Sequence, residues 1–156
     1  MSTGCPLCER LTSPAAAGGD GWVSRSECWA VSGHPGLLVP GWLAVQTVRH
    51  VESLAELNDL EAAALGPTLR SVSDWLMVAT RADRTYQYAL GETVRHVHVL
   101  VGVPLATDDA NGRGGRLLTR ILQRDPSLID GAASADVLAR VRAVARKSSP
   151  QAQPTP

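Results

Sequence analysis

The most regular alternation of polar and apolar positions in the chain runs from residue 95 to residue 101. Successive side chains of a β-strand point to opposite faces, so this pattern places His96 and His98 on the same face. Val97, Val99 and Val101 would point the other way, toward a core, and valine favours strands. The sequence therefore predicts a strand over 95–101 that carries two imidazoles side by side.

Two imidazoles on one face of a rigid strand are compatible with a catalytic site or with a metal site. They are equally compatible with one structural histidine beside one exposed histidine. The alternation alone leaves these interpretations open.

Shorter segments predict the rest of a sheet. We expect strands over 21–23, 27–31, 42–48 and 85–89, with a turn at 24–26. The strands over 85–89 and 95–101 should form an antiparallel hairpin through a tight connection at 90–93. Cys28 falls within a predicted strand, where a small core residue is the expected role.

Helical periodicity occupies residues 53–81 and the C-terminal part of the chain. Two overlapping capping boxes, Ser53 with Glu56 and Asn58 with Glu61, mark helix starts. Pro67 should kink this helix or begin a second segment. An apolar stripe at the helical period supports the long helix; it comprises Leu60, Ala64, Leu69, Val72, Leu76 and Val78.

Shorter helices are expected over 116–123 and 134–147, with loops over 12–21, 32–41 and 107–115. Residues 148–156 have the composition of a disordered tail. Strands, one helix, a hairpin and then further helices imply few parallel crossovers. We therefore predict a single α+β domain over 1–147 with a mostly antiparallel sheet.

Composition narrows the functional classes. The chain has 156 residues, 44% of them hydrophobic and 19% charged, which suits one globular domain. Its formal net charge of zero predicts no general attraction to nucleic acid or to a membrane surface. The N-terminus lacks the pattern of a signal peptide, and no apolar run is long enough to span a membrane. We expect a cytoplasmic protein.

The cysteines suggest chemistry at the N-terminus. Cys5 and Cys8 form a C-x-x-C motif, but a thioredoxin-like redox motif needs a preceding strand, and only four residues precede Cys5. Half of a zinc site is favoured instead, and it needs two more ligands. His50, at the end of a predicted strand, and His96 would complete a set of two cysteines and two histidines, which leaves His98 free beside the ion.

Three motifs in order resemble the histidine triad (HIT) superfamily, and the resemblance covers roughly residues 5–104. They are the C-x-x-C pair, the segment Arg49-His50-Val51-Glu52-Ser53-Leu54, and Gly91-Glu92-Thr93-Val94-x-His96-Val97-His98. Their spacing is similar to that of the zinc-bearing bacterial branch. The resemblance implies a half-barrel of about five antiparallel strands with helices packed on it, and it implies a homodimer.

The resemblance also implies an activity: hydrolysis or transfer of a nucleotidyl group at the α-phosphate. By this resemblance Cys5, Cys8, His50 and His96 hold a structural zinc, and His98 is the nucleophile. Gly91, Glu92 and Thr93 match a segment that contacts phosphate. His34 lies near the position of an acidic residue that contacts ribose, so it is a candidate substrate-binding residue that departs from the pattern; from the residues alone, an exposed loop histidine is favoured.

The main departure is Leu100, which stands where the third histidine of the triad is expected. Leucine donates no hydrogen bond, so stabilisation of developing charge must come from elsewhere. Glu92 would serve in proton transfer if it neighbours His98, although an ion pair with Arg95 is the favoured interpretation. Two alternatives therefore stay open: an enzyme on this fold that uses His98 as acid or base on a non-nucleotide or unusual phosphorylated metabolite, and a non-catalytic zinc-stabilised binding module.

Overall fold

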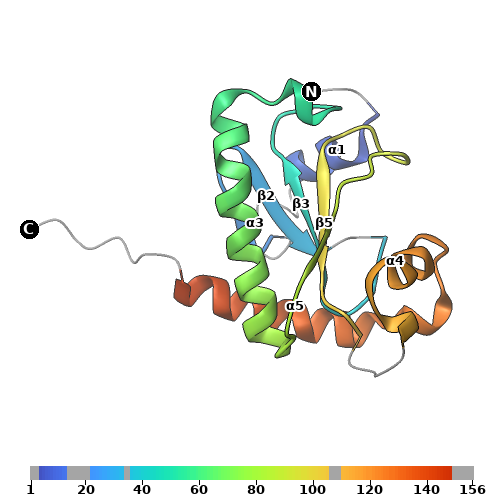
Figure 1. Ribbon diagram of the computed structural model, residues 1–156. Helices are drawn as coiled ribbons and strands as arrows, with labels where there is room; N and C mark the ends of the chain where they lie inside the picture. Colours follow the sequence, from blue (N-terminus) through green and yellow to red (C-terminus); the bar gives the residue numbers. More distant parts are fainter. Residues whose placement is uncertain (1–3, 14–21, 34–35, 106–109, 149–156) are drawn as a thin grey trace, which may run out of the picture.

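Five antiparallel strands form one sheet at the centre of the molecule (Figure 1). In the computed structural model, residues 4–13, 22–33, 36–105 and 110–148 are described. The strands are β1 (Ser24–Arg25), β2 (Trp29–Gly33), β3 (Trp42–Thr47), β4 (Tyr86–Tyr88) and β5 (His98–Gly102), in the order β1-β2-β3-β5-β4. Each neighbouring pair is antiparallel, which confirms the predicted α+β class.

Helices cover both faces of this sheet. They are α1 (Pro6–Thr12), α3 (Asp59–Thr80), α4 (Gly114–Leu122) and α5 (Gly131–Ser148), with single 3₁₀ turns at η1 (Leu54–Glu56), η2 (Ala110–Gly112) and η3 (Pro126–Leu128). The main core joins the sheet to α3 and α5, whereas separate apolar clusters join it to α4 and to α1. None of the helices within these described ranges is long and apolar enough to cross a membrane.

Alternation along β5 decides which residues face which layer. Val97, Val99 and Val101 are buried in the main core, as predicted. Leu100 points to the opposite face and packs with Leu117 and Ile121 of α4. The two faces of one strand therefore serve two different apolar clusters.

The strand itself begins later than predicted. β5 starts at His98, so His96 lies in the bend before the strand and not within it. The His96 N–H donates to the Val94 carbonyl, and the Val97 N–H donates to the carbonyl of Val51, which belongs to neither neighbouring strand. These bonds turn the chain away from the ladder, so the predicted range of 95–101 is wrong at its beginning.

The hairpin of β4 and β5 is confirmed, with Tyr88 opposite Leu100. Its connection is longer than the predicted turn at 90–93, because it extends from residue 89 to residue 97. The turn predicted at 24–26 is also wrong, because Ser24 and Arg25 form β1. The Ser26 hydroxyl oxygen accepts from the N–H groups of Cys28 and Trp29, which moves the turn to 26–28.

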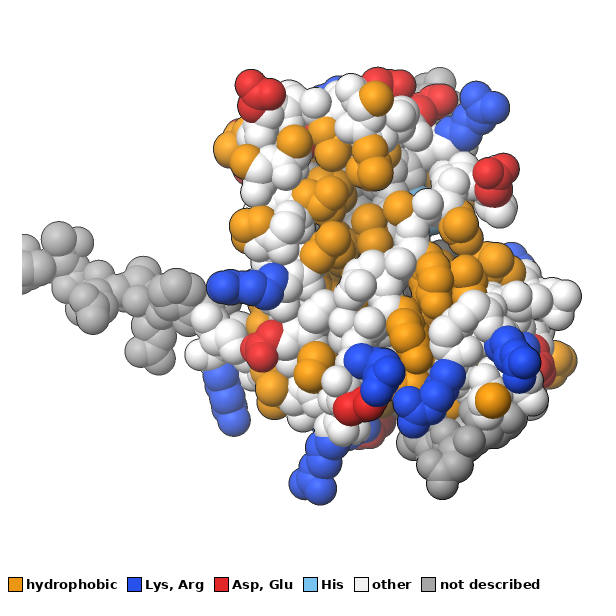
Figure 2. All heavy atoms as spheres, viewed as in Figure 1, with side chains coloured by type: hydrophobic (Ala, Val, Ile, Leu, Met, Phe, Trp, Pro, Cys, Tyr) orange, Lys and Arg blue, Asp and Glu red, His pale blue; other side chains and the backbone are white. Residues whose placement is uncertain are grey.

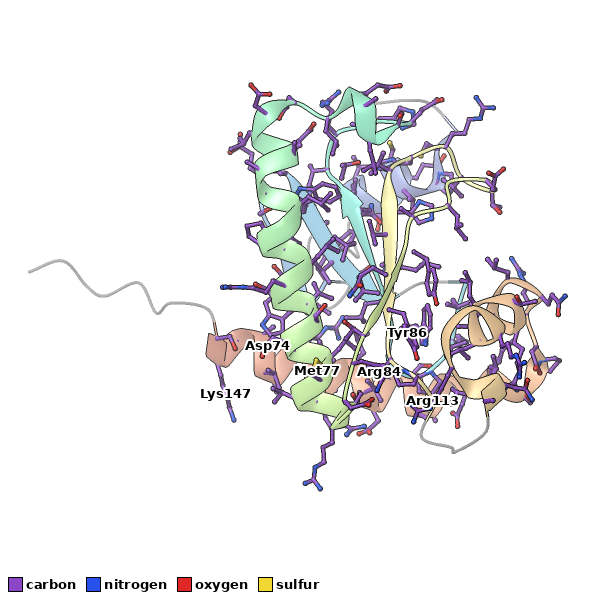
Figure 3. All side chains as sticks on the ribbon, in the orientation of Figure 1. Asp74, Met77, Arg84, Tyr86, Arg113 and Lys147 are labelled. Carbon is purple, nitrogen blue, oxygen red and sulfur yellow. The ribbon has the colours of Figure 1, made fainter. Side chains whose placement is uncertain are left out.

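Helix α3 is a continuous helix that contains Pro67, so Pro67 does not begin a second segment. The capping box of Asn58 and Glu61 is present in both directions. The predicted apolar stripe is correct at its centre and wrong at its ends: Val72 and Leu76 are buried, but Leu60 and Val78 are more than half exposed. Asp74 and Met77, labelled in Figure 3, lie on the exposed side of α3.

The remaining differences lie at element boundaries. Helix α1 was not predicted, α4 begins two residues before the expected position, and α5 begins three residues before it and includes Ser148. Ser32 and Gly33, expected in a loop, belong to β2. Cys28 is buried in the main core, as predicted. The predictions for residues 14–21, 34–35, 106–109 and 149–156 lie outside the described residues.

Candidate functional site

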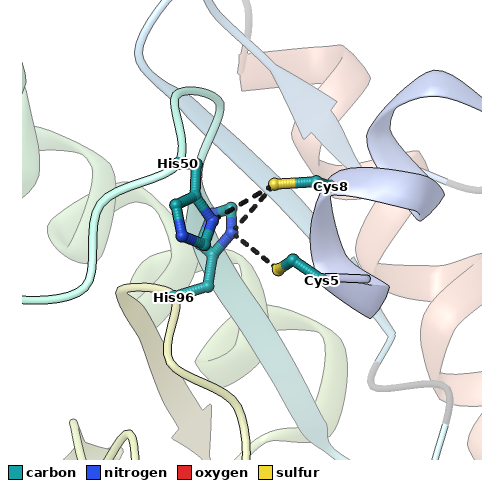
Figure 4. A group of neighbouring side chains, drawn as sticks. All are labelled: Cys5, Cys8, His50 and His96. Atoms are coloured by element: carbon teal, nitrogen blue, oxygen red, sulfur yellow. Dashed lines mark hydrogen bonds between the residues drawn. The ribbon is translucent and has the colours of Figure 1, made fainter. Parts of the chain in front are cut away.

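Four side chains from three separate segments meet beside the N-terminal end of β5 (Figure 4). Cys5 is the N-cap of α1 and Cys8 lies in its first turn, so the three-residue spacing places both thiols on one side of the helix. His50 follows β3, and His96 precedes β5. Their candidate ligand atoms all lie within 4.8 Å of one another, and all but His50 are buried.

The separations suit a tetrahedral metal ion. The Cys5 Sγ and His96 Nδ1 atoms are 3.4 Å apart, Cys8 Sγ and His50 Nδ1 are 3.4 Å apart, and Cys8 Sγ and His96 Nδ1 are 3.5 Å apart. Tetrahedral zinc with ordinary Zn–S and Zn–N bond lengths requires about 3.6 Å between a sulfur and a nitrogen ligand. The donor set and its spacing therefore fit zinc.

A backbone carbonyl orients His96 for this role. The His96 Nε2 atom lies 2.9 Å from the Thr47 carbonyl oxygen, which can only accept, so Nε2 carries the proton. The lone pair of Nδ1 then faces the two sulfurs. Burial lowers the pKa of the His96 imidazole, and His96 is fully buried, so the neutral form that binds a metal is favoured.

His50 has a carboxylate partner on its other side. Its Nε2 atom lies 3.6 Å from Glu52 Oε1, which is within ion-pair distance but longer than a hydrogen bond. The two imidazole rings meet edge to face with centroids 5.2 Å apart. Sequence reasoning missed Glu52, although its position two residues after His50 was a signal.

Helix α1 is fastened to the sheet by contacts other than the cysteines. The buried Gln46 of β3 donates from Nε2 to the Leu7 carbonyl of α1. Val94, in the connection between β4 and β5, packs against Cys5, Leu7 and Cys8. The cysteine cluster therefore also contacts the segment that leads into β5.

His98 is held differently from His96. Its Nδ1 atom lies 2.7 Å from the His96 carbonyl oxygen, so Nδ1–H is the donor and Nε2 keeps its lone pair. His98 is half-buried and lines a cavity of about 430 Å³. The two histidines that the sequence placed together thus have separate surroundings, one in the cysteine cluster and one at a cavity.

The cavity beside His98 brings together most of the candidate substrate-binding residues. Gly91, Glu92 and Thr93 line it, together with Gly36, Leu37, Tyr88, Leu90, Val94, His98, Leu100, Ile121, Leu122 and Arg124. Gly91 has a positive φ of 74°, a conformation that suits glycine. The interpretation of His34 lies outside the described residues.

The walls of this cavity are mainly apolar. Leu100 is buried against Trp42, Leu117 and Ile121, so the position where the sequence resemblance implies a third histidine is part of an apolar cluster. Tyr88 stacks on Trp42 with ring centroids 5.9 Å apart, and burial raises the pKa of the Tyr88 phenol. Figure 2 shows hydrophobic side chains gathered on the surface between the β4 edge and α4.

Glu92 and Arg95 do not form the expected ion pair. Arg95 Nη1 lies 3.8 Å from Glu52 Oε2, and the Arg95 side chain is 83% exposed. The partner of Arg95 is therefore Glu52 and not Glu92. Glu52 also lies near His50. Glu92 instead lines the cavity with His98.

No sequence pattern indicated that residues at the end of α4 would line this cavity. Ile121, Leu122 and Arg124 enter it from the end of α4, about two dozen residues beyond the last recognised motif. A C-terminal helix of ordinary amphipathic pattern carries no signal for the sheet face on which it packs. These residues could not have been assigned before the fold was known.

A second cavity of about 410 Å³ lies at the other end of β5. Its lining includes Val103, Thr80 and Arg113, and Figure 3 shows Arg113 on the α4 side and Arg84 near the start of β4. No histidine or cysteine of the described residues lines it. The chemistry of the candidate site therefore belongs to the cavity beside His98.

Comparisons with known proteins bear on the fold. No family model matches the sequence, and no curated protein matches it. Solved structures do match, among them a Hit-like protein involved in cell-cycle regulation from Bartonella henselae, with a TM-score of 0.64 and 11% identity over 92% of this chain and 98% of that one. A hypothetical histidine triad nucleotide-binding protein from Sulfolobus tokodaii has a TM-score of 0.64 and 16% identity over 92% of this chain and 93% of that one.

A Zn-bound histidine triad family protein from Mycobacterium smegmatis matches with a TM-score of 0.62 and 16% identity, over 94% of this chain and 98% of that one. At these identities the likeness concerns the fold. The chain has the fold of histidine triad proteins, as the sequence motifs implied.

Proposed function

We propose that this protein is a histidine triad enzyme that hydrolyses or transfers a nucleotidyl group at a phosphate, with His98 as the nucleophile and a structural zinc. The observation that carries the proposal is the hydrogen bond from His98 Nδ1–H to the His96 carbonyl, 2.7 Å long. It leaves the Nε2 lone pair available for attack, and His98 lines a cavity large enough for a small molecule.

The reaction then has two displacements. In the first, the His98 Nε2 lone pair forms a bond to phosphorus while the bond from phosphorus to the leaving group breaks. The leaving group keeps that electron pair and takes a proton. In the second, water attacks phosphorus and gives one proton to the group that protonated the leaving group, the Nε2–phosphorus bond breaks, and Nε2 regains its lone pair. If another acceptor replaces water, the same steps transfer the nucleotidyl group.

Other residues of the cavity supply binding and protons. The segment 91–93 lines the cavity with His98, which supports a role for its backbone N–H groups and the Thr93 hydroxyl as donors to phosphate oxygens. Glu92 is the carboxyl group of that segment and the candidate donor of a proton to the leaving group. Leu100 contributes no hydrogen bond to either step.

Zinc would be held by Cys5, Cys8, His50 and His96, and with four protein ligands it would supply structural stabilisation and no catalytic water. His96 then has two tasks. Its imidazole faces the cysteines, and its backbone carbonyl accepts from His98. The ligand cluster thereby fixes the tautomer and the direction of the nucleophile.

The test is release of AMP from adenosine phosphoramidate by the zinc-loaded protein. We expect turnover by the wild type and none by H98A, because Nε2 is the attacking atom. The control is H98N, which keeps a polar side chain of smaller size and lacks the nucleophile, so it too should be inactive. Turnover by H98A at the wild-type rate would refute the proposal.

A second candidate function is favoured by the apolar surroundings of Leu100: an enzyme that uses His98 as acid or base on a non-nucleotide or unusual phosphorylated metabolite. It predicts no covalent adduct on His98 and no turnover of adenosine phosphoramidate. A homodimer and a location in the cytoplasm remain predictions of the sequence; light scattering after size exclusion tests the first.

A further inference from the structure

The cavity beside His98 contains one cationic side chain from the described residues, that of Arg124. A phosphoryl group that approaches His98 carries negative charge, and the third triad position cannot donate a hydrogen bond because it is Leu100. Most of the remaining wall is apolar, so a charge within the cavity is less screened than a charge in open water. Arg124 is exposed, and Glu92 is the other charged residue of the lining, so Arg124 is the cation that an incoming phosphoryl group would meet there.

The backbone of Arg124 is unusual for a residue with a side chain. Helix α4 ends at Leu122, Gln123 is its C-cap, and Arg124 follows with a φ of 53°. The Arg124 N–H closes the helix end by donating to the Ile121 carbonyl. Glycine is the usual residue for this left-handed position because it lacks a Cβ atom. A strained residue at a ligand cavity is a candidate for function.

The neighbours of Arg124 do not neutralise it. Asp125 is the adjacent acid, but its Oδ2 atom accepts from Arg120 Nε at 2.8 Å, and its Oδ1 atom accepts from the Ser127 hydroxyl at 2.7 Å. These bonds lower the pKa of Asp125 to about 2, so its charge is already engaged with Arg120. Within the described part of the chain, no ion pair involves the Arg124 guanidinium.

The apolar wall has its own implication. Leu90 is 47% exposed and Leu122 is 56% exposed, and both line the cavity with Leu37. Exposed leucines that converge on a cavity favour a ligand with a planar or apolar group. The cavity thus combines an apolar wall with polar lining residues, namely His98, Glu92, Thr93 and Arg124.

We propose that Arg124 binds a non-bridging phosphoryl oxygen of the substrate and takes over the charge stabilisation for which Leu100 is unsuited. The substrate class is a phosphate ester or phosphoramidate whose planar or apolar group contacts Leu37, Leu90 and Leu122. This inference rests on the proposed function, because it concerns the same cavity and the same phosphoryl group.

The test compares AMP with adenosine as probes of the zinc-loaded full chain. R124G removes the guanidinium and gives the left-handed backbone the residue that suits it, so its melting temperature should not fall below that of the wild type. R116A is the matched control, because Arg116 is an exposed cation in the neighbouring helix α4 and does not line the cavity. R124K keeps the charge and loses the planar fork.

We expect R124G to weaken AMP binding and to lower kcat/KM for adenosine phosphoramidate, each by roughly 10- to 100-fold, the usual effect of losing a charged hydrogen bond. Adenosine binding should not change. R124K should give an intermediate loss, and R116A should match the wild type.

Equal AMP affinity in R124G and the wild type would overturn the inference, and so would an equal loss for AMP and adenosine. A wild-type protein that binds neither probe would also overturn it. If the wild type binds AMP through Arg124 but does not turn over adenosine phosphoramidate, the proposed function fails and the inference stands.

Discussion

At the scale of single residues, His96 and His98 differ in the ring nitrogen that donates to a backbone carbonyl. His96 has its proton on Nε2 because of Thr47, and His98 has its proton on Nδ1 because of His96. Opposite nitrogens are therefore left with a lone pair, one toward two sulfurs and one toward a cavity. The sequence could place the two imidazoles near each other, but it could not assign these tautomers, because they depend on which backbone carbonyl the folded chain brings beside each ring.

Leu100 is the residue whose replacement tests the apolar cluster. Leu100→His would place an imidazole in a site that is 7% exposed and packed against Trp42 and Leu117. We expect the free energy of unfolding to fall by about 1–3 kcal/mol, because a polar group is buried without a defined partner. Urea denaturation measures this change.

The control for that change is Leu100→Met, which conserves volume and apolar character and should cost less than about 1.5 kcal/mol. A Leu100→His variant as stable as the wild type would contradict the apolar packing of Leu100 against α4. A gain in phosphoramidate turnover by Leu100→His would indicate that the cavity still admits a third histidine.

At the scale of elements, the predictable parts were those with a local signal. The capping box of Asn58 and Glu61 placed the start of α3, and the Thr85–Ala89 alternation placed β4 within one residue at each end. The start of β5 was missed because its cause is a hydrogen bond between Val97 and Val51, which are far apart in the sequence. Helix α1 was missed because a seven-residue helix with one buried side depends on tertiary contacts.

The close packing of β3 on β5 gives a prediction at Gly102. A Cβ atom there would lie 2.1 Å from Trp42 Cδ2, and Trp42 is fixed by its indole N–H, which donates to the Val103 carbonyl. Gly102→Ala should therefore destabilise the fold by about 1–3 kcal/mol. Gly115→Ala is the control, since a Cβ there meets no atom within 4 Å and alanine favours the helix. Equal melting temperatures for both variants would contradict this packing.

The ion pair between α3 and the segment after β3 gives a pH dependence. Arg49 donates to both carboxylate oxygens of the buried Glu61, at 2.9 and 2.6 Å, and these bonds hold the pKa of Glu61 below its usual value. A lowered pKa stabilises the fold above the unfolded value of about 4.3, and the contribution is lost as pH falls through the folded value.

Glu61→Gln tests this dependence. The variant should have a lower melting temperature than the wild type at neutral pH. This difference in melting temperature should shrink as the pH is lowered from about 5 to about 3, the range in which the carboxylate titrates. Thermal denaturation of both proteins across that range measures it. If the difference in melting temperature stayed constant down to about pH 3, the lower stability of the variant would come from packing and not from the carboxylate charge.

At the scale of the whole molecule, the cysteine cluster connects the N-terminal helix, the end of β3 and the start of β5. The same His96 that faces the cysteines accepts the hydrogen bond of His98, so the cluster and the cavity are mechanically linked. The motifs predicted that the four candidate ligands would be neighbours, and the four residues do meet. They did not predict the role of α4, whose packing face has no sequence signature.

Loss of one thiolate should therefore affect both zinc content and stability. We expect Cys8→Ser to reduce zinc content below one ion per chain and to lower the free energy of unfolding by several kcal/mol, because a structural metal contributes to folding. Cys28→Ser is a matched control, a buried cysteine outside the cluster that should keep its zinc. Elemental analysis and urea denaturation measure the two effects, and full zinc content in Cys8→Ser would contradict the ligand assignment.

The most direct test of the central claim is to look for the covalent intermediate on His98. The zinc-loaded wild type is mixed with adenosine phosphoramidate, quenched rapidly in alkali and digested, and the adduct is located by mass spectrometry. We expect an adenylyl group on the peptide that contains His98 in the wild type and no such group in H98N. Turnover of adenosine phosphoramidate with no adduct on His98, or with an adduct on another residue, would contradict it.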